Sequence, residues 1–268
     1  MVRPPRLVAF LAALFLALGF STVEGVILYR SGDPSENNAA PGMLFPHEGW
    51  DYEGSWGEFL GTAIAPNFFI SAAHIGQAGG SPFTLQNVNY TVLRGFYDPQ
   101  SDLVIWQVAQ TFPTFASLYS RPDEIGQVTI DIGRGTQRGV SYSLNNQMLG
   151  WLWGPPDGTQ RWGENTFSDA FQYQTNWDLL YATFDPGQRT EECTLSSGDS
   201  GGAAFINDGG SYSIRAGFLL SRARNGCWSP GPILSPRDFI RPASQPSWPG
   251  SRPSWRRRLA DTKAVLRR

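Results

Sequence analysis

The chain has 268 residues, of which 41% are hydrophobic and 16% charged, with a formal net charge of −2. Residues 26–241 hold 12 arginines and no lysine against 21 acidic side chains, a net charge of −9. Nucleic-acid binding needs basic side chains gathered on one face, so this balance argues against a nucleic-acid partner. Two histidines and two cysteines, well separated, are also a poor ligand set, so we expect no metal site.

The N-terminus has the pattern of a secretory signal. Arg3 and Arg6 precede an apolar run over residues 7–20, which is too short for a membrane span of ~20 residues. Residues 23–25 then supply small side chains where a signal peptidase cleaves. The pattern predicts a signal peptide over residues 1–25 and no stable membrane span after cleavage, with an uncleaved anchor as the alternative. We therefore expect a secreted protein or one of the periplasm or cell envelope.

The next part of the chain is predicted to be all-β. Apolar runs of strand length alternate with segments rich in Gly, Pro, Asn and Asp, and no run keeps a helical period for ten residues. The chain has 30 glycines and 20 prolines, which supply the turns between them. This spacing is typical of β-barrels and sandwiches. The clearest runs cover residues 59–64, 68–73, 90–96, 103–108, 128–132, 203–206 and 216–220.

The last segment, residues 242–268, differs in kind. It has seven basic residues against one acidic residue and no apolar run able to join a core. Its Pro, Ser and Arg content predicts a disordered basic extension. A segment that sorts the protein to the cell surface is the functional alternative. Residues 26–241 are left as one domain of a size that buries a proper core.

Three short motifs carry the chemistry. Residues 198–202 read Gly-Asp-Ser-Gly-Gly, in which small residues leave the Ser200 hydroxyl open and two backbone amides can converge on a developing oxyanion. Residues 71–74 end in His74 after an apolar run, and Asp102 opens another one. Both histidines, His47 and His74, precede the serine. That order excludes the nucleophile elbow of α/β-hydrolases, in which the base follows the serine.

The three motifs, in the order His, Asp, Ser, resemble the trypsin/chymotrypsin-like serine peptidase family. The resemblance spans residues 26–241, and its His74–Asp102 spacing is similar to that of compact bacterial members. It implies two six-stranded antiparallel β-barrels with a boundary near residues 112–125. His74 and Asp102 are then expected on the first barrel and Ser200 on the second, with the active site in the cleft between them.

The resemblance also implies a role for each residue. Ser200 is the expected nucleophile, His74 the general base and acid, and Asp102 the group that orients His74. The amides of Gly198 and Ser200 form the expected oxyanion hole. Asp98, in Tyr-Asp-Pro-Gln, competes with Asp102, but aspartate before proline is explained as a turn residue.

Asp199 is expected to be structural within the site. In the resembling family this aspartate accepts a buried cation. Cleavage after Gly25 would create an amino terminus at Val26 that could supply that cation, and Arg134 and Arg138 are the internal alternatives.

The resemblance also implies features of the primary specificity pocket. The resemblance places Thr194 near the floor of the primary pocket, so no carboxylate is expected there to bind a basic side chain. Leu220 and Ser221 depart from the family's usual wall residues. Arg222 or Arg224 could meet an acidic side chain, with both pointing to solvent as the alternative. An even pair of cysteines in an exported chain favours a disulfide between Cys193 and Cys227, with two buried thiols as the alternative.

Together these features predict a secreted serine endopeptidase that needs no cofactor and acts on protein or peptide substrates through an acyl-enzyme. A catalytically silent binding or structural protein on the same fold is the main alternative. An esterase with the same triad is a third possibility. The sequence does not indicate the oligomeric state.

Overall fold

A computed structural model describes residues 25–42, 47–99, 101–173, 177–184, 187–209, 212–215 and 232–234. Over these residues the protein is built from strands, with two short 3₁₀ helices, η1 (His47–Tyr52) and η2 (Ala73–Ile75). None of the helices described is long and apolar enough to cross a membrane.

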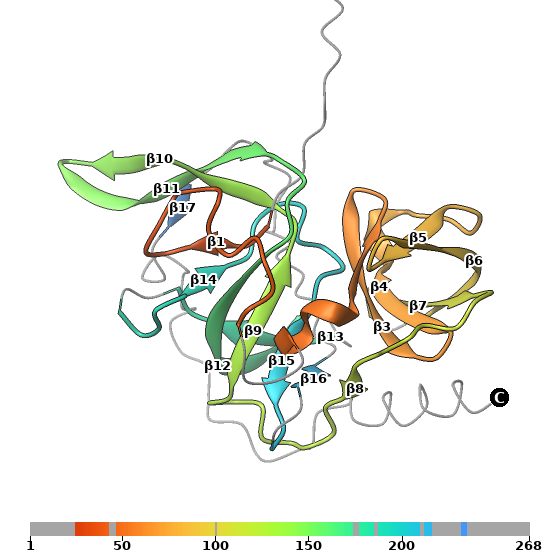
Figure 1. Ribbon diagram of the computed structural model, residues 1–268. Helices are drawn as coiled ribbons and strands as arrows, with labels where there is room; N and C mark the ends of the chain where they lie inside the picture. Colours follow the sequence, from red (N-terminus) through yellow and green to blue (C-terminus); the bar gives the residue numbers. More distant parts are fainter. Residues whose placement is uncertain are drawn as a thin grey trace, which may run out of the picture.

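The first unit is a closed barrel (Figure 1), with strands hydrogen-bonded in the order β2-β3-β4-β7-β6-β5. Its neighbouring strands are all antiparallel. The strands are β2 (Glu53–Trp56), β3 (Phe59–Ala65), β4 (Phe68–Ala72), β5 (Pro82–Leu85), β6 (Val88–Tyr97) and β7 (Leu103–Val108).

Large aromatic side chains fill this barrel. Trp56, Phe69 and Phe83 are fully buried, and the Phe69 and Phe83 rings stack with their centroids 4.0 Å apart. The β5–β6 hairpin turns at Gln86 and Asn87, both at positive φ, as a two-residue hairpin turn with right-handed twist requires. The aromatic core and tight turns explain why this short segment closes on itself.

The second unit is a six-stranded sheet in the order β13-β12-β9-β15-β16-β8. Only the β8–β16 pair is parallel. Over the described residues the sheet is open, so this unit is a half-barrel beside the closed first barrel. The strands are β8 (Ser117–Leu118), β9 (Val128–Gly133), β12 (Arg161–Tyr173), β13 (Trp177–Ala182), β15 (Ala204–Asn207) and β16 (Tyr212–Arg215).

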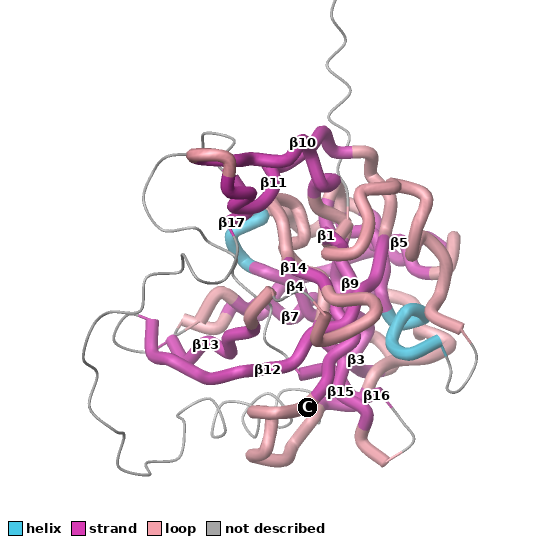
Figure 2. Tube along the Cα trace, turned by 90° about the vertical axis from the view of Figure 1, so that its left-hand side faces the viewer, coloured by secondary structure: helices cyan, strands magenta, loops and turns pink. Residues whose placement is uncertain are grey.

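Two smaller sheets complete the second unit. The long β10–β11 hairpin (Thr136–Leu144 and Gln147–Pro156) pairs with β17 (Pro232–Leu234). It lies at the top of the molecule in both ribbon and tube views (Figures 1 and 2). Strand β1 (Ile27–Leu28) pairs with β14 (Cys193–Thr194), so the first described strand lies beside one of the last.

The two units pack through an apolar cluster. Leu60 and Ile70 of the first barrel meet Ile130, Ile132 and Phe205 of the second sheet in one buried group. Helix η1 contacts β9 and β16 as well as β2 and β3, and it lies between the units in Figure 1. The all-β fold with two six-stranded units predicted from the sequence is confirmed. The first unit is a closed barrel, and the second is an open sheet over the described residues, with one parallel pair of strands.

Candidate active site

His74 lies where β4 ends. The strand runs to Ala72, the chain then turns through η2, and Gly76 ends that turn in the left-handed region at φ 70°. The imidazole is placed at the rim of the barrel, with 43% of the side chain exposed. The apolar run before it anchors the strand, so the ring projects from a rigid support toward the second unit.

Asp102 holds His74 through two contacts and the preceding Ala73 through a third. Its Oδ2 accepts a hydrogen bond from His74 Nδ1, and its Oδ1 accepts the backbone N–H of His74 at 2.9 Å. The Asp102 carbonyl accepts the N–H of Ala73, also at 2.9 Å. Only 11% of the Asp102 side chain is exposed. The carboxylate therefore orients the ring and leaves Nε2 free to face the second unit.

Asp98 is bonded within the loop between β6 and β7. Its Oδ2 accepts a hydrogen bond from the Ser101 hydroxyl at 2.5 Å, and its N–H donates to the Leu103 carbonyl at 2.9 Å. Both contacts close the loop between β6 and β7. The structure thus gives Asp98 a turn contact and brings Asp102 to the histidine.

Ser200 comes from the second unit, in the loop before β15. Its Oγ lies 2.8 Å from His74 Nε2, so the two units meet at a hydrogen bond between serine and histidine. The Ser200 carbonyl accepts the N–H of Leu60 at 3.4 Å. Gly201 follows at φ 84°, and a Cβ there would lie 2.0 Å from the Leu60 carbonyl oxygen. Only glycine fits this crossing of the loop over β3.

The backbone of this loop is tightly turned and leaves two amides without an acceptor among the described residues. Gly198 is at φ 99°, a conformation that few other residues adopt. The loop closes on itself through bonds from Asp199 N–H to the Ser196 carbonyl and from Gly202 N–H to the Asp199 carbonyl. Within the described part of the chain, the amides of Gly198 and Ser200 donate to no acceptor. Those two amides remain available to a substrate oxygen.

Asp199 is buried beneath the loop. Its Oδ1 accepts the Gly135 N–H at 2.6 Å, and its Oδ2 accepts the N–H and hydroxyl of Ser196 at 2.6 and 3.1 Å. Burial raises the pKa of Asp199 to about 7, while these hydrogen bonds oppose the rise. The carboxyl group is thus held by neutral donors.

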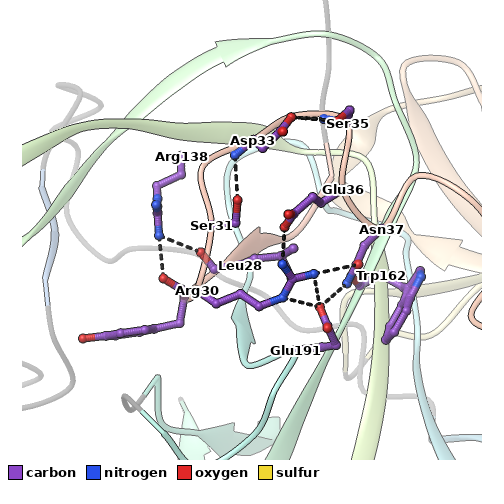
Figure 3. A network of polar contacts seen from close by, with 11 residues as sticks. Leu28, Arg30, Ser31, Asp33, Ser35, Glu36, Asn37, Arg138, Trp162 and Glu191 are labelled. Carbon is purple, nitrogen blue, oxygen red and sulfur yellow. Dashed lines mark hydrogen bonds and ion pairs between the residues drawn. The ribbon is translucent and has the colours of Figure 1, made fainter.

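The two arginines considered as partners for Asp199 point elsewhere. Arg134 donates to the carbonyl of Gly158 and to groups of the first barrel. Arg138 donates to the carbonyl of Leu28, as Figure 3 shows, and to the carbonyl of Tyr29. Neither supplies the internal cation that the sequence allowed.

A second buried carboxyl group lies near Asp199. Asp131 on β9 is 5% exposed, and its Oδ1 has no hydrogen-bond partner among the described residues. Burial raises the pKa of Asp131 to about 6. Its negative charge also raises the pKa of Asp199, so the two carboxyl groups disfavour each other's ionised form.

The expected disulfide is not present at Cys193. That residue is a fully buried free cysteine whose Sγ donates to Asp131 Oδ2 at 3.7 Å. A Cβ on Gly163 of the neighbouring strand would lie 2.3 Å from the Cys193 Cβ, so the thiol sits in a closely packed position. The other expected partner, Cys227, lies outside the described residues.

The predicted pocket is only partly described. Thr194 is half-buried on β14, opposite Ile27 in the β1–β14 pair. The predicted wall residues Leu220, Ser221 and Arg222 lie outside the described residues, as do the signal segment 1–24 and the tail 242–268. No group of three or more His, Cys, Asp or Glu side chains in the described ranges could hold a metal ion.

The N-terminal segment is anchored on the second unit. Val26 is 2% exposed, and a Cβ on Gly133 would lie 3.1 Å from Val26 Cγ1 and 2.0 Å from Asp199 Oδ1. The side chains of Val26 and Asp199 therefore both lie close to Gly133. Farther along, Arg30 is paired with Glu36 and Glu191 (Figure 3), which ties residues 30–37 to the segment before β14.

Several residues of the site were not predicted from the sequence. Ser196, Gly135 and Leu60 hold the loop of Ser200, and Asp131 faces it from β9. The pair of glycines at 133 and 135, beside the buried strand β9, is the one local signal of a close backbone approach. The other contacts join residues far apart in the chain.

Comparison with known proteins adds little to this geometry. No protein-family model matches the chain, and no curated protein matches it. Among solved structures, the chain is similar to the crystal structure of Rv3671c protease in its inactive form, at 14% sequence identity and a TM-score of 0.36. The match covers 59% of this chain and 78% of that one. At this level it carries no argument, and the assignment of the fold rests on the strand pairing described above.

Proposed function

We propose that the protein is a serine peptidase that cleaves protein or peptide substrates through an acyl-enzyme. The observation that carries the proposal is the chain of contacts from Asp102 to His74 to Ser200, joined at 2.8 Å between Nε2 and Oγ across the two units. This pattern of nucleophile, base and orienting group activates a serine hydroxyl. The unpaired amides of Gly198 and Ser200 beside it support the same chemistry.

The proposed reaction uses each group in turn. Ser200 Oγ attacks the scissile carbonyl carbon while its proton passes to His74 Nε2, and the carbonyl oxygen becomes an oxyanion held by the two free amides. The C–N bond then breaks and His74 gives its proton to the leaving amine. Water, activated by His74, hydrolyses the acyl-enzyme and restores the serine. Asp102 stabilises the imidazolium formed at each step and does not itself take the proton.

The test is active-site labelling with a fluorophosphonate beside casein hydrolysis. The wild-type protein should be labelled and should cleave casein, and Ser200→Ala should do neither while remaining folded. Asp98→Asn is the matched control for Asp102→Asn, because only the second loses the contact with His74. A folded wild-type protein without labelling would favour the silent-fold alternative. Labelling with cleavage of simple esters but not of casein would favour an esterase.

Preference at the cleavage site follows from Thr194. Because a threonine is expected at the pocket floor instead of a carboxylate, we propose that the enzyme does not prefer Arg or Lys before the scissile bond. Profiling with a peptide library checks this, and a clear preference for basic side chains would overturn it.

Export and maturation belong to the same proposal. We propose that residues 1–25 are removed during export, to the outside of the cell or to its envelope, and that Val26 becomes the amino terminus. Val26 is already buried, and its side chain and the Asp199 carboxyl group both lie close to Gly133, so we expect the new ammonium group to reach Asp199. N-terminal sequencing of the secreted protein tests this, and a start at any other residue would exclude it.

A further inference from the structure

The candidate triad is divided between the two units. His74 and Asp102 lie at the ends of β4 and β7 in the first barrel, and Ser200 precedes β15 in the second sheet. The 2.8 Å contact between His74 and Ser200 therefore depends on how the units are placed against each other. A shift of either unit would separate the base from the nucleophile without unfolding anything.

The apolar cluster between the units does not define this placement closely. Leu60, Ile70, Ile132 and Phe205 attract one another through burial, which is not directional. The backbone bond from Leu60 to Ser200 is long, at 3.4 Å. Closer control requires directional contacts near the loop.

Arg134 supplies such contacts. It follows β9 in the second unit, and its Nε donates to the Gly158 carbonyl at 2.7 Å. Its Nη1 crosses to the first barrel, where it donates to Ser55 Oγ at 3.1 Å and to the Gly57 carbonyl at 3.4 Å. Ser55 and Gly57 belong to β2 and the turn into β3. The guanidinium is a rigid planar fork, so these bonds set direction as well as distance.

The next two residues hold the loop of Ser200. The Gly135 N–H donates to Asp199 Oδ1 and the Thr136 N–H to Ser196 Oγ, both at 2.6 Å. A Cβ on Gly135 would lie 2.7 Å from the Ser197 carbonyl oxygen, so the two backbones are in close contact. Three consecutive residues thus contact both units. The side chain of Arg134 bonds the first barrel, and the amides of Gly135 and Thr136 bond the loop at residues 196–200.

We infer that Arg134 is a positioning residue, which holds the loop carrying Ser200 and the two free amides in register with the first barrel. This inference rests on the proposed peptidase function. Arg134 acts through the turn at Gly57 and through Gly135, so its loss displaces the oxyanion site and the serine relative to His74. Small displacements of a reacting group cost about 10- to 100-fold in rate.

The kinetic test compares Arg134→Met with Arg121→Met. Arg121 is the matched control because its guanidinium bonds Asp123, Asp208 and Tyr119, which all lie outside the first barrel. Arg134→Met should lower kcat by about 10- to 100-fold with little change in KM, and the control should match the wild type. Methylguanidinium added to Arg134→Ala should restore part of the activity, and methylammonium should not. Wild-type kcat in Arg134→Met would overturn the inference while leaving the proposed function intact.

A second measurement does not depend on activity. Hydrogen exchange of backbone amides should become faster in Arg134→Met at residues 55–60 and 196–202 and stay unchanged in the interior strands β6 and β7. The same comparison in Arg121→Met should show no change at either segment. Unchanged exchange at both segments in Arg134→Met, or faster exchange spread evenly over the chain, would overturn the positioning role even for a protein without peptidase activity.

Discussion

Outside the site, Glu53 is an acidic residue buried inside the first barrel. It lies on β2, 5% exposed, and Thr62 Oγ1 donates to its Oε1 at 2.6 Å. Its Oε2 has no hydrogen-bond partner among the described residues. Burial raises the pKa of Glu53 well above its ordinary value. Burial therefore favours the neutral form of this side chain inside the barrel.

That state makes stability depend on pH. The folded protein keeps the proton of Glu53 to a higher pH than the unfolded chain does. Stability therefore falls as pH rises from the pKa of Glu53 in the unfolded chain, about 4, toward its pKa in the folded protein. Glu53→Gln keeps an acceptor for Thr62 and cannot ionise, so it should flatten this part of the profile. Denaturant unfolding across that pH range checks it, with the exposed Glu58→Gln as control. An unchanged slope in Glu53→Gln would contradict the assignment.

Cys193 allows a second prediction about a single residue. Burial raises the pKa of its thiol well above the usual value, and the nearby charge of Asp131 adds to the rise. The thiolate is the reactive form, so Cys193 should not react with a maleimide until the protein unfolds. Mass analysis of the peptide containing Cys193, before and after denaturation, measures this. Recovery of that peptide bridged to Cys227 would restore the disulfide predicted from the sequence.

At the level of elements, the loop over residues 196–202 is closely packed, so a side chain added at Gly201 would overlap its neighbours. Gly201 is in the left-handed region, and a Cβ there would also lie 2.5 Å from Ser71 Oγ. Gly201→Ala should cost about 2 to 5 kcal/mol of unfolding free energy and abolish labelling, because strain and overlap add.

Gly209 provides the matched control for that change. It is also at positive φ, at 68°, but a Cβ there would meet no atom within 4 Å. Gly209→Ala should therefore cost only about 1 kcal/mol and keep full labelling. Equal losses in the two variants, measured by denaturant unfolding, would mean that backbone strain alone decides and that the contact with β3 does not matter.

The elements also show how far the sequence determines the site. His74 and Asp102 each adjoin an apolar run that forms a strand, and the glycines around Ser200 mark a tight loop, so local pattern predicts the three residues whose side chains the structure brings together. The register that brings β4 beside β7 and the loop beside Leu60 comes from pairing between distant segments. The contacts of Arg134 with the first barrel and of Asp131 with the surroundings of Asp199 depend on that pairing. Neither residue belongs to a sequence motif that would predict its contacts. The paired cysteines suggested a bridge, whereas packing against β9 and β12 gives Cys193 a buried thiol.

For the whole molecule, the buried acids beside the N-terminal strand predict a pH effect linked to maturation. The pKa values of Asp131 and Asp199 are raised to about 6 and about 7. Each carboxyl group keeps its proton to a higher pH in the folded state than in the unfolded chain. The free energy of unfolding should therefore fall as pH rises from about 4 to about 7, by a few kcal/mol in total. An ammonium group at Val26 would favour the charged carboxylates and reduce that fall.

Two forms of the protein test the link, one beginning at Val26 and one that retains Gly25 and a preceding residue. The form beginning at Val26 should keep more of its stability between about pH 4 and about pH 7 in denaturant unfolding. Acetylation of the Val26 amine should remove the advantage. Identical pH profiles in the two forms would show that the amine does not reach the buried carboxyl groups.

The pairing of β1 with β14 has a consequence for when the site can exist. Ile27 lies opposite Thr194. The first described strand can therefore pair only after most of the domain has been synthesised. Contacts between such distant segments form late in folding, because closing the long loop costs entropy before any contact stabilises it. A chain still being synthesised or threaded across a membrane has no loop to carry Ser200 and no partner for its first strand. For the proposed peptidase, the order of the strands would therefore delay hydrolysis until the segment that carries Thr194 and Ser200 has emerged.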